Sequence, residues 1–548
     1  MKDDSGILTT NLIDLFEGGI YFAELAWREG IISDIRRLGP ERLGRPYLLP
    51  GFVDAHVHIE SSMLTPVEFS RLAVRHGTVA TVSDPHEIAN VLGLQGIHFM
   101  FANAEQTPLK IRFGAPSCVP ATPFETAGAE LGVAQLEALF ASGEVGYLSE
   151  MMNYPGVLAG DPAVLEKLAV AQRHGAPIDG HAPGLVGKDA QQYAAAGIST
   201  DHECASLDEA LDKISAGMHI LIREGSAARN FEALHELIRL HPDKVMFCSD
   251  DKHPDDLQRG HINQLAARAV AKGHDVFAVL RCACLNPVRH YRLPVGQLHV
   301  GNAMDAVLVD DLTDFQALQT WIDGRTVASR GICRIESFAT ESINRFSARP
   351  VEPADFAIPD PAVTIRAIKA FDGELATEEW LTFAKCDNGM IVADTERDIL
   401  FLAVVNRYQA APPAVALIHG FGFKHGALAS TVAHDSHNII AVGATIEALC
   451  LAVNDVIRRE GGIVVVNGKG RKFGLTLPVA GLMTGDDAEF VAAHYAELDR
   501  QAKRLGSTLR APFMTLSFMA LLVIPALKLS DKGLFDGRRF EFTSLAVT

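Results

Sequence analysis

The most informative part of the sequence is the stretch Pro50-Gly-Phe-Val-Asp-Ala-His56-Val-His58-Ile-Glu60. An apolar run typical of a buried strand leads directly into a His-x-His pair. Alternate residues of a strand point to one face, so His56 and His58 project side by side, with backbones roughly 6.5 Å apart. Two imidazoles at that spacing can chelate one metal ion. Two surface histidines would give the same short pattern, so the surrounding sequence has to decide between these interpretations.

Short apolar runs alternate with stretches of helical periodicity between residues 47 and 296, which is typical of repeated βα units. Eight such units in about 250 residues predict a (β/α)8 barrel of the TIM type. The expected helices include 66–76, 132–141, 162–174, 187–196, 206–216 and 231–241. The expected barrel strands are 47–58, 78–83, 110–115, 145–150, 177–181, 198–202, 218–223 and 245–250.

The segments on both sides of the barrel are rich in predicted strands. We expect residues 1–46 and 297–349 to pair in one small β-sandwich that is discontinuous in sequence. Residues 350–361 carry four prolines and read as a linker. Residues 362–548 are expected to form a C-terminal α/β domain, so the fold class is α/β throughout.

Composition narrows the function classes. The net charge of −18 disfavours nucleic acid and acidic membranes as partners. The eight cysteines show no disulfide pattern, which fits a reducing cytoplasm. The start of the chain lacks the apolar core of a signal peptide. The apolar run at 514–527 is too short to span a bilayer. We therefore expect a cytoplasmic protein that does not associate with membranes.

Nearly every predicted barrel strand ends in a residue that can bind metal or move protons. Active sites of such barrels form at this face from the ends of different strands. The interior of a buried strand has no structural need for these residues, so chance explains the pattern poorly. In chain order the strand ends carry His56 and His58; Asp84, His86 and Glu87; Ser117 and Cys118; Glu150; His181; His202 and Glu203; Arg223 and Glu224; and Asp250 and Asp251.

These strand ends predict a centre of two metal ions. His56 and His58 would hold one ion, His181 and His202 the other, and Glu150 would bridge both. Two such ions lower the pKa of a shared water, so that hydroxide forms at neutral pH. Asp250 would accept the proton of this nucleophile. Each residue alone could instead cap a turn or form an ion pair, and only their joint occurrence favours a hydrolytic site.

The order of these residues resembles that of the amidohydrolase superfamily, in which a β-sandwich accompanies the barrel. Longer motifs resemble the bacterial adenine deaminases over nearly the whole chain. The matching stretches are PGFVDAHVHIESSMLTP (50–66), SDPHEIANVLG (83–93), SEMMNYPGV (149–157), DGHAPGL (179–185), MHILIREGSAARN (218–230), CSDDKHP (248–254) and GFGFKHGALASTVAHDSHNII (420–440).

The resemblance implies hydrolysis of adenine to hypoxanthine and ammonia, in purine salvage. It assigns six ligands to two divalent ions, Mn²⁺ or Fe²⁺, with Zn²⁺ compatible with the same ligand types. Glu150 holds the place of a carbamylated lysine in many relatives. Asp250, or the neighbouring Asp251, would act at the eighth strand. The six ligands are His56, His58, Glu150, His181, His202 and Asp250.

Further residues are expected to contact the substrate. Glu87 or Glu203 would assist protonation of the purine ring, with His86 beside them. The loop after the seventh strand offers Arg223, Glu224 and Ser226, although a salt-bridged loop would look the same. On a helix, His434 and His437 would share one face. They would bind metal or close over the adenine, unless they only begin a helix capped by Asp435 or Ser436.

Two rival functions remain at this point. The first is another activity on the same scaffold, such as deamination of a different purine or pterin, or hydrolysis of a cyclic amide. The second is a non-catalytic scaffold, which would be expected to have lost ligands that this sequence keeps. The resemblance also implies a homo-oligomer, a dimer or larger.

Overall fold

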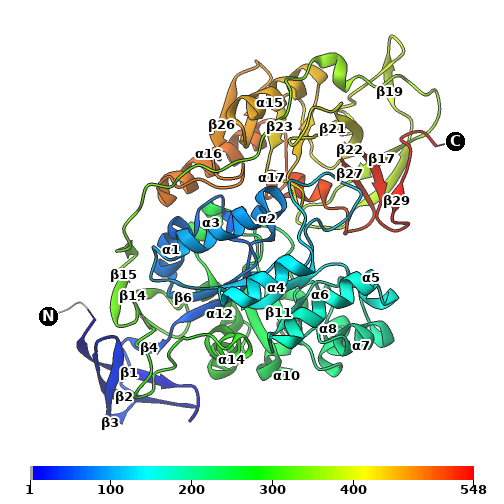
Figure 1. The fold of residues 1–548 in the computed structure, drawn as a ribbon. Coiled ribbons are helices and arrows are strands. Elements are labelled where there is room, and N and C mark those ends of the chain that lie inside the picture. The colour runs from blue at the N-terminus through cyan, green and yellow to red at the C-terminus, as the bar shows by residue number, and fades with distance from the viewer. Residues whose placement is uncertain (1–3, 548) are drawn as a thin grey trace.

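The computed structural model describes residues 4–547, and Figure 1 shows its arrangement. Eight parallel strands in its middle form the predicted barrel, which confirms the α/β fold class. Most strands lie within one or two residues of their expected positions. They are β5 (Phe52–Val57), β6 (Thr78–Ser83), β7 (Lys110–Ala115), β8 (Val145–Met151), β9 (Ile178–Gly180), β10 (Thr200–Asp201), β11 (His219–Arg223) and β12 (Val245–Cys248).

Backbone hydrogen bonds close the strands into a ring. Strands β5 to β9 form one parallel sheet and β10 to β12 another. The Ser199 amide donates to the Ile178 carbonyl at 2.9 Å, which joins β9 to the start of β10. On the other side the Asp250 amide donates to the His56 carbonyl at 2.9 Å. The ends of β12 and β5 are therefore neighbours, as barrel closure requires.

The stretch 47–58 is two strands rather than the single strand that was expected. Residues Tyr47–Pro50 (β4) pair with the outer sheet, and β5 enters the barrel after Gly51. A Cβ atom at Gly51 would lie 2.2 Å from a methyl group of Val79, so only glycine fits at this crossing. The chain thus changes sheets immediately before the His-x-His pair.

The helices around the barrel begin where their sequences predict. Helix α6 (Pro162–Arg173) has proline in its first turn, and Asp161 accepts a hydrogen bond from the Ala163 amide at 2.9 Å. The predicted helix at 231–241 is broken into α9 (Phe231–Leu234) and α10 (Leu237–Leu240). Further helices around the barrel include α1 (Pro66–Ala73), α2 (His86–Leu92), α3 (Leu94–Ala104), α4 (Val133–Ser142), α7 (Gly187–Ala195), α8 (Leu207–Ser215), α11 (Pro254–Arg259) and α12 (Ile262–Ala271).

The segments before and after the barrel share one eight-stranded sheet, in the order β16-β15-β14-β13-β4-β1-β2-β3. Strand β14 was not predicted. The segment expected to be a linker contains a 3-10 helix whose Phe356 is fully buried. The strands are β1 (Gly6–Asp14), β2 (Gly19–Arg28), β3 (Ile31–Pro40), β13 (Ala306–Val309), β14 (Ala317–Ile322), β15 (Arg325–Ser329) and β16 (Ile332–Cys333).

A second eight-stranded sheet builds the C-terminal part of the chain, in the order β18-β17-β22-β21-β24-β23-β25-β26. Helix α15 (Ile446–Arg459) packs on β23, β24 and β25. The glycine-rich residues 467–471 form the hairpin turn between β25 and β26. The strands are β17 (Ile365–Lys369), β18 (Glu378–Thr382), β21 (Ile399–Val405), β22 (Ala414–His419), β23 (Ala427–Ser430), β24 (Ile439–Gly443), β25 (Gly462–Val466) and β26 (Lys472–Thr476).

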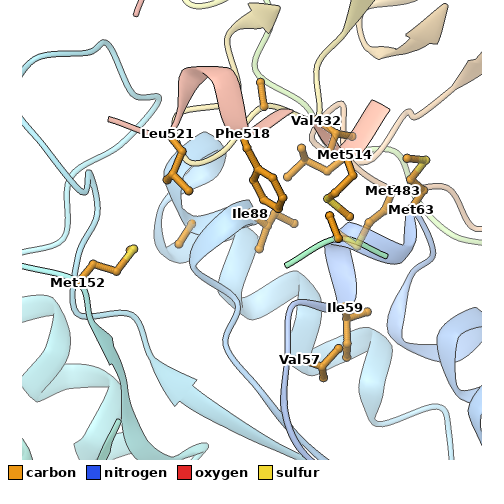
Figure 2. Packing of buried hydrophobic residues seen from close by; sticks show 14 of the residues in the cluster. Val57, Ile59, Met63, Ile88, Met152, Val432, Met483, Met514, Phe518 and Leu521 are labelled. Carbon is orange, nitrogen blue, oxygen red and sulfur yellow. The ribbon is translucent and has the colours of Figure 1, made fainter. Parts of the chain in front are cut away.

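The C-terminal part packs against the barrel on the side away from β1 to β3 (Figure 1). Helix α16 (Ala488–Arg504) contacts α1 and α11, and α17 (Pro512–Ser517) leads into the same interface. Figure 2 shows Phe518, Met514 and Ile88 of α2 in one buried apolar cluster. One continuous apolar core therefore joins the C-terminal part to the barrel and holds it in place against the barrel.

No helix among residues 4–547 combines the length and the hydrophobicity needed to cross a bilayer.

Candidate active site

The structure brings the six predicted metal ligands together at one end of the barrel. His56 and Glu150 lie at the ends of their strands, and the other four follow within two residues of a strand. All six are buried, with at most 6% of any residue exposed. Distant segments meet here because the carboxyl ends of parallel barrel strands share one face. The residues are His56, His58, Glu150, His181, His202 and Asp250.

Glu150 lies at the centre of this cluster. Its Oε2 atom is 2.8 Å from Nδ1 of His181 and 3.1 Å from Nε2 of His202. Its Oε1 atom is 3.3 Å from Nε2 of His58. One carboxylate therefore faces imidazoles of both predicted pairs, one through each oxygen, which is the arrangement that a bridging ligand needs.

Asp250 also contacts the His-x-His pair. Its Oδ1 atom is 3.3 Å from Nε2 of His58 and 3.6 Å from Nε2 of His56. Its backbone has a φ of 53°, in the left-handed region that aspartate tolerates better than most residues. The Arg223 guanidinium donates a hydrogen bond to Oδ2. Asp250 is thus held at a fixed orientation with one oxygen toward the histidines.

A buried group behind the cluster fixes the loops that carry His181 and His202. The Asp201 carboxylate accepts hydrogen bonds from the amides of Ala182, at 2.9 Å, and Glu203, at 2.8 Å. The Lys213 ammonium, also buried, lies 3.1 Å from Asp201. Residues that orient ligands in this way are a regular feature of metal sites.

The two carboxylates of the cluster remain ionised despite their burial. Desolvation opposes ionisation of Glu150, but the neighbouring imidazoles, His181 first, hold its pKa well below the usual range. Desolvation also opposes ionisation of Asp250, but the Arg223 guanidinium and His58 hold its pKa well below the usual range. Both side chains therefore present negatively charged oxygens to the cavity.

The cluster fits divalent metal ions by its donor set. Groups of three or four donor atoms lie within 4.8 Å of one another, among them His56, His58 and Asp250 on one side and His56, Glu150 and His202 on another. Within residues 4–547, the buried Nε2 atom of His181 has no hydrogen-bond partner, so a lone pair is free for a metal. Imidazole nitrogens and carboxylate oxygens without thiolate suit manganese, iron or zinc.

Only some of the residues predicted to contact the substrate lie at the cluster. Glu203 and Arg223 form a buried two-pronged ion pair, with distances of 2.5 and 2.9 Å, and both line the cavity. Glu224 instead pairs with Arg268 at 2.5 Å. Ser226 donates to an Asp256 carboxylate oxygen at 2.6 Å. Among the described residues, the lining of this cavity includes neither Glu224 nor Ser226.

His434 and His437 reach the barrel from the C-terminal part, but not from a helix. Residues 431–438 form a turn between β23 and β24, where His437 has a φ of 53°. The helix considered for this segment is therefore wrong. Nδ1 of His434 and Nε2 of His437 each contact a different carboxylate oxygen of Glu87 in α2. Burial opposes ionisation of Glu87, but these two imidazoles and His86 hold its pKa well below the usual range.

The sequence places Asp84 only among the strand-end residues and assigns it no specific contact at the site. Asp84 is buried and accepts from Nδ1 of His86 at 2.9 Å, and His86 Nδ1 lies 3.5 Å from Glu150. The position of Asp84 at the end of β6 was a usable signal. The C-terminal part adds cavity-lining residues that strand periodicity does not reveal. These are Leu375, Asp435, Phe518 and Leu521.

The contact between Glu87 and the two histidines is expected to be a main link between barrel and C-terminal part. Glu87→Gln removes the charge from a fully buried cluster and should lower the free energy of unfolding by about 3 kcal/mol. Thermal unfolding followed by circular dichroism measures this change.

A matched control crosses the same interface at its exposed rim. Glu489 of α16, whose side chain is 62% exposed, pairs with Arg75 at 2.7 Å. Glu489→Gln should change stability by less than about 1 kcal/mol, because solvent screens exposed pairs. Equal losses for the two variants would show that the Glu87 cluster has no special part in the interface.

Comparison with known proteins agrees with this geometry. Residues 47–327 match the model of the amidohydrolase family, and residues 374–541 match the adenine deaminase C-terminal domain. An adenine deaminase of Salinibacter ruber is 54% identical over 540 residues, which are 98% of both chains. The chain belongs to the adenine deaminase family. The resemblance inferred from the motifs is thereby confirmed.

Other members of the adenine deaminase family are similar over equal lengths. The adenine deaminase of Sulfurovum sp. is 52% identical and covers 98% of each chain. That of Methanosarcina mazei is 48% identical, covering 100% of this chain and 99% of the relative.

Among solved structures, N-isopropylammelide isopropylaminohydrolase from Burkholderia multivorans is 17% identical with a TM-score of 0.43, covering 57% of this chain and 96% of that one.

Proposed function

We propose that this protein hydrolyses adenine to hypoxanthine and ammonia at a centre of two divalent metal ions. One observation carries the proposal: the Glu150 carboxylate contacts imidazoles from the ends of β5, β9 and β10, with Asp250 beside them. Family membership over the full chain length supports adenine as the substrate.

The contacts support the following ligand assignment. His56, His58 and Asp250 would hold one ion, His181 and His202 the other, and Glu150 both. Manganese or iron is proposed, with zinc compatible with the same donors. When bound, divalent ions supply Lewis acidity and lower the pKa of water, so that hydroxide is available at neutral pH.

Asp250 is placed to move the protons of the reaction. Water adds at C6 of the purine, and the bond from C6 to the amino nitrogen then breaks. Asp250 takes the proton that remains on the added oxygen and delivers it to the departing nitrogen, which leaves as ammonia while that oxygen becomes the C6 carbonyl of hypoxanthine. Its ionised state and its anchoring by Arg223 suit this role, because a base must begin deprotonated and correctly oriented.

Acidic residues around the cavity would transfer protons to the purine ring and orient it. Glu203, held by Arg223, and Glu87, held by His434 and His437, both line the cavity. Either carboxylate could take the first proton of the attacking water and pass it to a ring nitrogen during addition at C6. The fixed position of each carboxylate favours one orientation of the purine, which is how a site built on rigid elements gains specificity.

The C-terminal part would close the site. Asp435, Phe518 and Leu521 line the cavity from this side. Apolar side chains of Phe518 and Leu521 exclude water from one wall, which strengthens charge interactions within the site. Asp435 has a buried carboxylate oxygen without a hydrogen-bond partner among residues 4–547, so it is available to accept a purine N–H group.

The cellular setting is proposed from coarser observations. All eight cysteines are free, and six of them are buried, which supports a reducing cytoplasm. Purine salvage there would be the role of the reaction. Assembly as a homo-oligomer is proposed from family resemblance, and light scattering of the purified protein would measure it.

A substrate panel tests the proposed reaction. Protein loaded with manganese is incubated with adenine, other aminopurines, aminopterins and cyclic amides, and ammonia release or ring opening is followed. Adenine should give the highest kcat/KM of the panel. A clear preference for another ring would show that the scaffold carries a different amidohydrolase activity, and no turnover of any compound would favour a binding role.

A further inference from the structure

The cavity that holds the metal-ligand cluster is small in this structure. We call it the inner cavity, bounded by Glu150, Asp250, His434 and Phe518 among others. Its free volume is about 20 Å³, which is room for roughly one water molecule and not for a two-ring purine. A second cavity of about 400 Å³ lies directly beside it, within the size range of small-molecule sites.

We propose that this second, outer cavity binds the purine base before the base reaches the metal-ligand cluster. The proposal rests on the function proposed above. The outer cavity lies between the loops after β8 to β11 and the C-terminal part. Its walls include Tyr154, Ala205, Ala233, Ile524 and Pro525.

The two cavities share one wall. Glu203, Arg223 and Leu375 line both of them. Arg223 contacts Glu203 in the wall and donates to Asp250 on the inner side. A base in the outer cavity is therefore separated from the proposed proton carrier by the thickness of these side chains. This continuity ties the outer cavity to the reaction rather than to an unrelated ligand.

The chemistry of the outer cavity suits a neutral, flat base. Apolar side chains of Tyr154, Ile524 and Pro525 can cover ring faces. Nε of Arg223 is buried and has no hydrogen-bond partner among the described residues, so a ring nitrogen of a purine would satisfy it. Both arginines of the lining are already paired with carboxylates, Arg223 with two and Arg229 with Asp256 at 3.7 Å, which disfavours a phosphorylated nucleotide.

The wall residue Leu375 belongs to the loop between β17 and β18. Within residues 4–547, this loop meets the barrel through one backbone hydrogen bond, from the Ala228 amide to the Gly373 carbonyl at 2.8 Å. It is bound more firmly to the C-terminal part, where Lys528 donates to the Leu375 carbonyl at 2.6 Å and to the Phe518 carbonyl at 2.9 Å. Leu375 and Phe518 would therefore withdraw together when the two cavities join.

Chemical filling of the outer cavity tests the proposal. Ala233 is exposed on α9 and lines the outer cavity, so Ala233→Cys places a reactive thiol in its wall with little change in volume. The variant is assayed in the metal-loaded full chain before and after alkylation with a bulky maleimide. Alkylated wild type controls for the exposed Cys386. Alkylated Ala163→Cys, at an exposed position of α6 that lines neither cavity, is the matched control.

The expected result is specific for access to the site. Alkylation at position 233 should lower kcat/KM for adenine by about tenfold or more, while metal content stays unchanged. Alkylation of Ala163→Cys should change neither quantity. Adenine should also slow the alkylation at position 233, and this readout needs no turnover. Full kcat/KM after complete alkylation, or an alkylation rate unaffected by saturating adenine, would overturn the proposal.

The same experiment separates the two proposals. If the unmodified protein releases no ammonia from adenine, the proposed function has failed whatever happens at position 233. If it deaminates adenine and alkylation at position 233 has no effect, only the outer cavity is wrongly assigned.

Discussion

Replacing Asp250 with asparagine is expected to reduce adenine turnover by roughly 10²–10⁴-fold, the usual contribution of a proton-transferring side chain. The substitution keeps the size of the residue, and asparagine tolerates the φ of 53° at this position at least as well as aspartate. Loss of the charge removes the group that accepts the proton from the added oxygen. Steady-state kinetics with adenine, beside thermal unfolding to show an intact fold, measures the effect.

The neighbouring aspartate provides the control for this prediction. Asp251 is also buried, but its Oδ1 atom accepts a hydrogen bond from Ser61 at 2.5 Å and lies 3.7 Å from Nε2 of His434 in the C-terminal part. Asp251→Asn keeps an oxygen that can accept this bond and should reduce turnover far less. A larger loss in Asp251→Asn than in Asp250→Asn would transfer the proton-carrying role to Asp251.

Glu150→Gln is expected to remove metal and activity together. The carboxylate faces His58 through one oxygen and His181 and His202 through the other, and glutamine can offer only one neutral oxygen. Metal content should fall from about two ions per chain to one or fewer, because a bridging ligand holds both. Elemental analysis of the purified variant measures this directly, and turnover should fall to the level of metal-free protein.

A second buried glutamate serves as the control for Glu150→Gln. Glu60 is 1% exposed and accepts a hydrogen bond from the Ile88 amide at 3.2 Å, and it is not one of the six proposed ligands. Burial raises the pKa of Glu60 to about 7, so a neutral side chain is tolerated there. Glu60→Gln should retain its metal. A Glu150→Gln protein that keeps both ions would contradict the bridging role.

The barrel and its ligand cluster follow from the sequence by local rules. Apolar runs of strand length alternate with helical periodicity, and β6 and β7 fall at the predicted residues. His56 and Glu150 converge because the carboxyl ends of parallel strands share a face, which makes spatial neighbours of residues far apart in sequence. Periodicity therefore placed these residues at one end of the barrel, and the family resemblance assigned six of them as ligands.

The closure of the site by the C-terminal part could not be predicted in the same way. Phe518 and Leu375 reach the cavity through packing between segments more than 140 residues apart, and their sequences show only apolar character. The turn at 431–438 was missed because histidines three residues apart suit a helix as well as a turn. The crossing at Gly51 depends on the position of Val79, which no local pattern reveals.

Metal reconstitution in the presence of adenine tests directly whether the protein deaminates adenine with two metal ions. Protein stripped by a chelator is titrated with Mn²⁺ while the conversion of adenine to hypoxanthine is followed by absorbance. Activity should be absent without metal and should reach its plateau at about two equivalents per chain. Full activity in the stripped protein, a plateau at one equivalent, or no conversion of adenine at any metal concentration would contradict a two-metal adenine deaminase.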